Sequence, residues 1–163
     1  MVWGAIRREG MGPLYKIDGT MDQVYFSFCE SKVHLDSFLQ EKYKEVLKMA
    51  LKDIPALQSG RATLQQDNAP CHTAQSIERF LSKNNATVLP WPANSPDLSP
   101  IENVWSCIAK KLQGMAFRNA DALFEAISHE WQQFPLETLQ KLYDSMPHRL
   151  MSVRRARGAA IRY

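Results

Sequence analysis

Hydrophobic residues recur along most of the chain at one of two spacings. Five segments repeat them every three to four positions, which is typical of one buried face of an α-helix. These segments predict helices at about 34–53, 74–83, 100–112, 120–134 and 136–145. Short β-prone runs predict strands at 2–6, 14–17, 62–66 and 86–91. Strands that alternate with helices indicate a mixed α/β sheet with helices packed on it.

The same spacing predicts which side chains point into the core. For the helix that begins near residue 100, the expected stripe is Ile101, Val104, Trp105, Ile108 and Leu112. For the next helix it is Leu123, Ile127 and Trp131, and for the first long helix it includes Val46, Leu47 and Met49 or Ala50. We expect Trp91 and Trp105 to be core residues rather than platforms for stacking bases.

Composition places the chain among ordinary globular proteins and excludes several other classes. Of its 163 residues, 45% are hydrophobic and 23% are charged, a balance typical of soluble domains. The sequence has neither a hydrophobic run long enough to span a bilayer nor the layout of a signal peptide. Cys29, Cys71 and Cys107 lack the spacing of a zinc site and suit a reducing compartment. We expect a nuclear or cytoplasmic protein without a membrane partner.

The positive charge is concentrated at the C-terminal end. The five arginines that follow the last acid, Asp144, exceed the formal net charge of +3, so the residues before them carry a net negative charge. Arginine forks pair with phosphate oxygens, which makes Arg149, Arg154, Arg155 and Arg157 candidate DNA contacts. A solvated basic run with no partner explains the same pattern.

Two polar, proline-containing stretches interrupt the amphipathic pattern, "QQDNAPCHTA" and "WPANSPDLSPIENVW". Asp67 in the first follows a predicted strand, and Glu102 in the second lies in the first turn of a predicted helix. Mg²⁺ needs only one or two protein carboxylates beside water and substrate phosphate oxygens. Two such ions can stabilise both the attacking and the leaving oxygen of a phosphoryl displacement. Asp67 and Glu102 are therefore candidate catalytic and metal-binding residues.

Structural roles explain the same residues equally well. Ser99, Pro100 and Glu102 match a capping box, in which the Glu102 side chain reaches back to the Ser99 amide. Asp67 or Asn68 can bond the following backbone in a turn. His72 can satisfy a backbone carbonyl. Spacing alone leaves both kinds of role open.

Four longer stretches resemble the catalytic domain of the Tc/mariner transposase superfamily. They are "VWGAIRREGMGPLYKIDGTMDQ", "LQQDNAPCHTAQSIERFL", "VLPWPANSPDLSPIENVWSCIAKKL" and "SMPHRLMSVRRARGAAIRY". The resemblance implies an RNase H-like fold whose second and third catalytic acids match Asp67 and Glu102. A glutamate in third place, with 34 residues between the two acids, is similar to the Tc branch. The resemblance to the superfamily also implies cleavage of double-stranded DNA at transposon ends and joining of these ends to a TA target, with Mg²⁺ or Mn²⁺.

The chain departs from the family pattern at its N-terminal end. The family's first catalytic aspartate precedes the segment that matches "VWGAI", and Met1 lies just before that segment. The resemblance therefore implies an N-terminally truncated sheet without its first strands, and without the helix-turn-helix region that reads transposon ends. Asp18 and Asp22 fall in a segment that the family places after the catalytic strand. The region between "GTMDQ" and "LQQDN" is longer than is usual in the family.

These observations predict a partial RNase H-like catalytic domain at residues 1–146 and a basic C-terminal tail at 147–163. With two of three acids, we expect this fragment of a DNA transposase to have weak activity or none by itself. A homodimer or a completing transposase chain could supply the missing ligand. The alternatives are a non-catalytic DNA-binding or assembly module that uses the arginine tail, and a folded remnant without activity.

Overall fold

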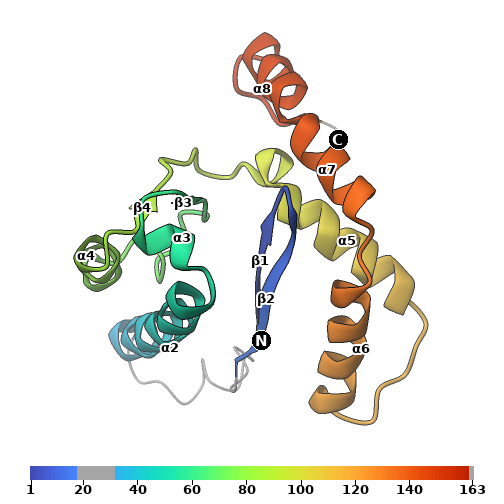
Figure 1. Ribbon diagram of the computed structural model, residues 1–163, viewed down its shortest axis with the longest axis horizontal. Coiled ribbons are helices and arrows are strands. Elements are labelled where there is room, and N and C mark those ends of the chain that lie inside the picture. The colour runs from blue at the N-terminus through green and yellow to red at the C-terminus, as the bar shows by residue number, and fades with distance from the viewer. Residues whose placement is uncertain (18–31, 162–163) are drawn as a thin grey trace. The chain divides into compact units, whose positions relative to one another are not determined.

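A computed structural model describes residues 1–17 and 32–161, with side chains described for all of these except 32–38. Asp18, Asp22 and Cys29 lie outside the described residues. The elements, in chain order, are the strands β1 (Val2–Arg7) and β2 (Gly10–Lys16), the helices α2 (Lys32–Asp53) and α3 (Pro55–Gln58), the strand β3 (Thr63–Leu64), the helix α4 (Gln75–Lys83), the strand β4 (Thr87–Val88), the 3₁₀ helix η1 (Pro96–Leu98), and the helices α5 (Pro100–Leu112), α6 (Ala120–Gln132), α7 (Leu136–Asp144) and α8 (Met146–Arg155) (Figure 1).

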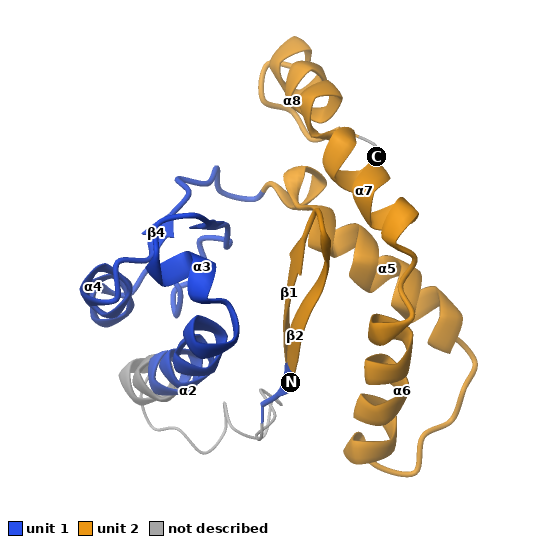
Figure 2. Cartoon of the chain, in the orientation of Figure 1, with its two compact units in different colours: residues 1, 15–94 blue, residues 2–14, 95–163 orange. Residues whose placement is uncertain are grey.

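The chain divides into two compact units (Figure 2). Unit 1 comprises Met1 and residues 15–94, and unit 2 comprises residues 2–14 and 95–163. Unit 2 therefore combines most of the N-terminal hairpin with the C-terminal helices. In the sequence, residues 15–94 of unit 1 separate these two parts. The expected division between residues 146 and 147 does not coincide with this one.

Unit 1 is built around a parallel strand pair and two helices. Thr63 pairs with Thr87 and Leu64 with Val88, and α4 connects the two strands. Helices α2 and α4 contact each other, and their apolar faces supply most of the unit's buried side chains, among them Val46, Leu47, Ile77 and Leu81. Ala50, one of the two residues considered for the buried face of α2, is buried. Met49, the other residue considered at that position, is exposed.

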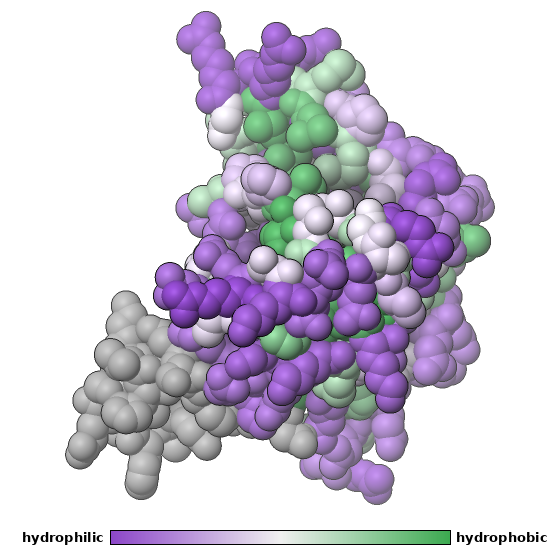
Figure 3. Space-filling view, turned by 60° about the vertical axis from the view of Figure 1, so that its left-hand side comes forward, coloured by the Kyte–Doolittle hydropathy of each residue, from purple (hydrophilic) through white to green (hydrophobic). Residues whose placement is uncertain are grey.

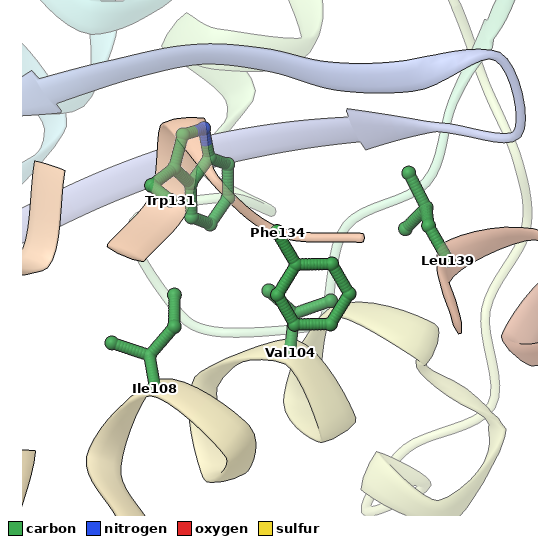
Figure 4. Packing of buried hydrophobic residues seen from close by; sticks show 5 residues of the cluster. All are labelled: Val104, Ile108, Trp131, Phe134 and Leu139. Atoms are coloured by element: carbon green, nitrogen blue, oxygen red, sulfur yellow. The ribbon is translucent and has the colours of Figure 1, made fainter. Parts of the chain in front are cut away.

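Unit 2 holds a second core where α5, α6 and α7 meet the β1–β2 hairpin. Figure 4 shows Val104 and Ile108 of α5 facing Trp131, Phe134 and Leu139. The Trp131 indole nitrogen donates a 3.0 Å hydrogen bond to the Gly12 carbonyl, so the buried ring keeps its polar atom satisfied. Ile101, Trp105 and Leu112 pack against this cluster, as their spacing predicts, and Ile127 does so as well. Leu123, expected to point inward, is exposed.

Side chains of α7 attach this helix to the hairpin. The Tyr143 hydroxyl donates to the Ile6 carbonyl at 3.0 Å, and burial raises the pKa of Tyr143 to about 12. The phenol therefore remains a donor throughout the neutral range. At the exposed hairpin turn, the Arg8 guanidinium donates two hydrogen bonds to Asp144 Oδ1, at 2.9 and 3.0 Å, and a third to Oδ2 at 3.3 Å. Because this ion pair is solvated, its contribution to stability is small.

Exposed large hydrophobic side chains are scattered along the described chain, at Met1, Met49, Leu89, Met115, Leu123, Leu136, Leu150 and Met151. On the face drawn in Figure 3, hydrophilic residues cover most of the surface and hydrophobic ones appear in patches between them. Among the residues that the structure describes, no helix is both long and apolar enough to cross a membrane.

At Gly4 the hairpin packs closely against the Trp131 ring. A Cβ atom at this position would lie 2.5 Å from Trp131 Cη2 and 2.9 Å from Cζ2, well inside van der Waals contact. We expect Gly4→Ala to lower the free energy of unfolding of this core by about 1–3 kcal/mol, measured by urea denaturation. Phenylalanine lacks the outer ring atoms of tryptophan. In the Trp131→Phe background, the Gly4→Ala cost should therefore shrink, and equal costs in both backgrounds would contradict this packing.

Candidate functional site

Asp67 lies three residues beyond the end of β3, in unit 1. Its Oδ1 accepts a 3.1 Å hydrogen bond from the Ala69 amide, which confirms the predicted turn at "QDNAP". The side chain is nevertheless 71% exposed. The turn thus holds the carboxylate while leaving it open to solvent.

His72 is the second partner of this carboxylate. Its Nδ1 lies 2.6 Å from Asp67 Oδ1. Because an ionised carboxylate only accepts hydrogen bonds, Nδ1 carries the proton and donates it. Among the described residues, the ring of His72 therefore bonds a carboxylate and not the backbone carbonyl that the sequence suggested. Sequence spacing could not reveal this contact, since the loop between the two residues has no regular period.

His72 is also held by Tyr43 of α2, through a ring contact, and by Gln66, through a hydrogen bond. The Tyr43 and His72 rings are tilted by 37° with centroids 4.2 Å apart, and the Tyr43 hydroxyl donates to Gln66 Oε1. Gln66 Nε2 in turn donates to the His72 carbonyl at 3.3 Å. Burial, followed by smaller effects of Cys71 and Asp67, raises the pKa of Tyr43, so its hydroxyl remains a donor.

A cleft of about 390 Å³ adjoins this group within unit 1. The loop residues Gln66, Asn68, His72 and Trp91 line one part of it, and residues of α4, of β4 and of the segments next to them line the rest. Asn68 Nδ2 donates to the Trp91 carbonyl at 2.8 Å and so joins the loops that follow β3 and β4. Trp91 is partly buried in this cleft.

Glu102 lies in the first turn of α5, in unit 2, and its side chain is exposed. Ser99 is the N-cap residue and Pro100 follows it, as predicted, but the side chain of Ser99 makes no capping hydrogen bond. The Ser99 amide donates to the Pro96 carbonyl at 3.0 Å and so is not the partner of Glu102. The capping-box interpretation is therefore wrong, because η1 already satisfies the amide that Glu102 was expected to bind.

Arg149 fixes the segment that precedes Glu102. Its side chain is 0% exposed, its Nη1 donates to the Asp97 carbonyl at 2.9 Å and its Nε donates to Ser145 Oγ at 3.0 Å. Asp97 Oδ2 also accepts from the Ile161 amide at 3.0 Å. Arg149 therefore joins α8 to η1, and the prediction that groups it with the DNA-contacting arginines is corrected by its complete burial.

The other arginines of the expected tail are exposed. Residues up to Arg155 form α8, which packs on α7 and η1, so this region is largely a helix of unit 2. Arg154 and Arg155 lie in its last turn, and Arg157 follows with a positive φ of 53°. All three side chains are exposed.

The available donors suit a hard divalent cation. Asp67 and Glu102 offer exposed carboxylate oxygens, which are the ligands that Mg²⁺ and Mn²⁺ accept. Within the described residues, no group of three or more histidine, cysteine or acidic side chains is placed to hold a metal ion. Asp67 belongs to unit 1 and Glu102 to unit 2, so their role as a joint site remains a prediction.

A family model and curated relatives both match most of the chain. A family model described as a DDE superfamily endonuclease matches residues 2–124. The chain is 32% identical to the transposable element Tc1 transposase of Caenorhabditis elegans, with 100% of this chain and 54% of that protein covered. It is 30% identical to the Tc3 transposase of the same organism, with 99% and 52% covered. The chain thus spans about half the length of the curated relatives that it matches.

Solved structures share the fold. The Mos1 transposase catalytic domain, solved with Raltegravir and Mg, matches with a TM-score of 0.78 at 18% identity, over 99% of this chain and 76% of that one. A mariner Mos1 paired end complex with Mg matches with a TM-score of 0.74 at 19% identity, over 95% and 42%. The predicted RNase H-like α/β fold is therefore confirmed.

The exposed position of Glu102 has a measurable consequence for stability. Because its carboxylate makes no hydrogen bond or ion pair with the described residues, we expect Glu102→Gln to change the free energy of unfolding by less than about 0.5 kcal/mol. Asn119 is the matched control, since its side chain does cap α6 by accepting from the Ala122 amide at 2.8 Å. Asn119→Ala should cost about 1 kcal/mol in the same denaturation experiment. An equal or larger loss for Glu102→Gln would restore the structural explanation.

Proposed function

Because this chain belongs to the DDE superfamily endonucleases, with the family model matching residues 2–124, we propose that it carries part of the catalytic centre of a DNA transposase. The observation that carries the proposal is the exposure of the two acids that match the family's catalytic residues. Asp67 is held in the turn that follows a strand and is open to solvent, and Glu102 is exposed without the structural bond expected of it. Both acids are thus available to a ligand.

Divalent metal binding is the chemistry that these acids support. In this proposal Asp67 and Glu102 hold Mg²⁺ or Mn²⁺, which is the kind of ion present in the Mos1 structures. When bound, the ions would stabilise the charge on the attacking and leaving oxygens of a DNA phosphodiester. The protein's part is to fix the carboxylate of Asp67 and to present that of Glu102 for the metal.

The proposal includes a third ligand from outside the described residues. A divalent pair held by only two carboxylates binds more weakly and is positioned less well than one held by three. We expect the 163 residues alone to cut or join DNA weakly or not at all. A preceding segment, a second copy or another transposase chain would complete the site.

Double-stranded DNA is the proposed substrate, with transposon ends and a TA target as in the resembling family. Arg154, Arg155 and Arg157 expose their side chains at the end of α8, where guanidinium groups can pair with backbone phosphates. Such contacts position DNA without reading its sequence. The same surface supports the second candidate function, a non-catalytic DNA-binding module, which would need these arginines and neither acid.

Metal binding tests the catalytic proposal. We expect calorimetric titration with Mn²⁺ to show weak binding to the wild-type chain and no heat for Asp67→Ala, because the variant loses a direct ligand. Glu102→Gln should weaken binding as well. Glu125→Gln serves as the control, since it removes an exposed carboxylate from α6 and should leave the titration unchanged. Wild-type binding in Asp67→Ala would contradict the proposed site.

Salt dependence tests the DNA-binding surface. Each neutralised phosphate contact contributes about 0.9 to the slope of log affinity against log salt concentration. We expect Arg154→Ala/Arg155→Ala to lower this slope by about 2 for a random duplex, measured by fluorescence anisotropy. Lys48→Ala/Lys52→Ala removes the same charge from the exposed side of α2 and should change the slope much less. Equal changes in the two double variants would mean that the arginines act only through net charge.

A further inference from the structure

We propose that His72 is a positioning residue that leaves one particular oxygen of Asp67, Oδ2, for the divalent ion. This inference rests on the proposed function, because it concerns how Asp67 presents itself to the metal. It adds a role for a residue outside the pair of acids. His72 acts through Asp67 and does not itself bind the metal.

The two oxygens of Asp67 have different surroundings. Oδ1 accepts from both the Ala69 amide, at 3.1 Å, and His72 Nδ1, at 2.6 Å. Oδ2 makes no hydrogen bond or ion pair with any described residue, and the side chain is 71% exposed. Since two donors already occupy Oδ1, a cation gains most by binding at Oδ2, where no donor has to be displaced.

His72 can hold Asp67 because its own ring and backbone are held. The ring packs on Tyr43 with centroids 4.2 Å apart, and Tyr43 is only 6% exposed. The His72 carbonyl accepts from Gln66 Nε2, and the Gln66 amide oxygen accepts from the Tyr43 hydroxyl. Tyr43, Gln66 and His72 thus each contact the other two, so the position of His72 is fixed from α2. An isolated turn residue would lack this support.

Such fixation lowers the cost of binding an ion. A free aspartate on a loop must give up its side-chain rotations when it coordinates a metal. Here the Oδ1 bonds have already restricted these rotations before the metal arrives. Partners that orient a metal ligand in this way typically change metal affinity by about 10–100-fold when they are removed.

Two substitutions at one position separate the role of the donor from that of bulk. In His72→Asn, the amide nitrogen can take nearly the place of Nδ1 and still donate to Asp67. In His72→Gln, the longer side chain carries its amide nitrogen toward the place of Nε2, away from Oδ1. We expect the Mn²⁺ dissociation constant of the 163-residue chain, measured by electron paramagnetic resonance, to rise about tenfold or more in His72→Gln. In His72→Asn it should stay within about threefold of the wild type.

The melting temperature of each variant accompanies the titration. A merely structural histidine would lower the melting temperature in both variants and would not restore metal affinity in His72→Asn. Equal dissociation constants for wild type, His72→Asn and His72→Gln would overturn the inference while leaving the proposed function intact. Unchanged metal binding in Asp67→Ala would instead refute the proposed function itself.

A measurement on the wild type covers the case in which His72→Gln does not fold. In ¹⁵N nuclear magnetic resonance, the ring nitrogen Nδ1 of His72 should carry its proton both before and after addition of Mg²⁺. The carboxyl carbon signal of Asp67 should shift when the ion is added. Loss of the Nδ1 proton on addition of Mg²⁺ would show the histidine leaving Asp67 or binding the metal, and would overturn the inference.

Discussion

Backbone amides need hydrogen-bond partners wherever a strand or helix ends, and this need shapes both candidate acids. β3 is only two residues long, so the polypeptide beyond it soon leaves the ladder and the Ala69 amide takes its partner from Asp67. Near Glu102, the chain leaves η1 and enters α5 within one residue, and the Ser99 amide finds its partner in Pro96. Asp67 follows the end of a strand and Glu102 lies in the first turn of a helix, but only Asp67 is used to satisfy the backbone.

The side chain of Asp67 is thus held by hydrogen bonds, whereas that of Glu102 makes none with the described residues. Asp67 has one oxygen fixed by an amide and an imidazole, so its orientation is set before any ligand arrives. Glu102 is instead positioned through its backbone, because the buried Arg149 joins α8 to the carbonyl of Asp97, five residues earlier. A long-range side chain thus supports each loop from another element, Tyr43 in unit 1 and Arg149 in unit 2.

Sequence periodicity predicted the buried faces of helices. It did not predict positions that are set by one long-range contact. The stripe on α5 was predicted because Val104 and Ile108 recur at helical spacing. A β-prone run before a polar turn identified β3, although the predicted strand extended two residues beyond its end. Arg149 was predicted to contact DNA because it belongs to the basic cluster at the C-terminal end. Its burial depends on a carbonyl 52 residues away, which no local pattern encodes. Likewise, nothing in the spacing of Tyr43 and His72 indicated that their rings would meet, and the joint role of Asp67 and Glu102 remains a prediction.

The bond between Trp131 and Gly12 joins residues that are 119 positions apart. On a ribosome that adds about 5–20 residues per second, the hairpin is made roughly 6–24 seconds before its indole partner. During that interval the face of the hairpin that will cover Trp131 has no core to pack against, while the α2, β3, α4 and β4 segments of unit 1 can already fold. β1 and β2 are thus synthesised well before the core that buries them, which leaves this face of the hairpin exposed to aggregation or chaperone capture during the interval.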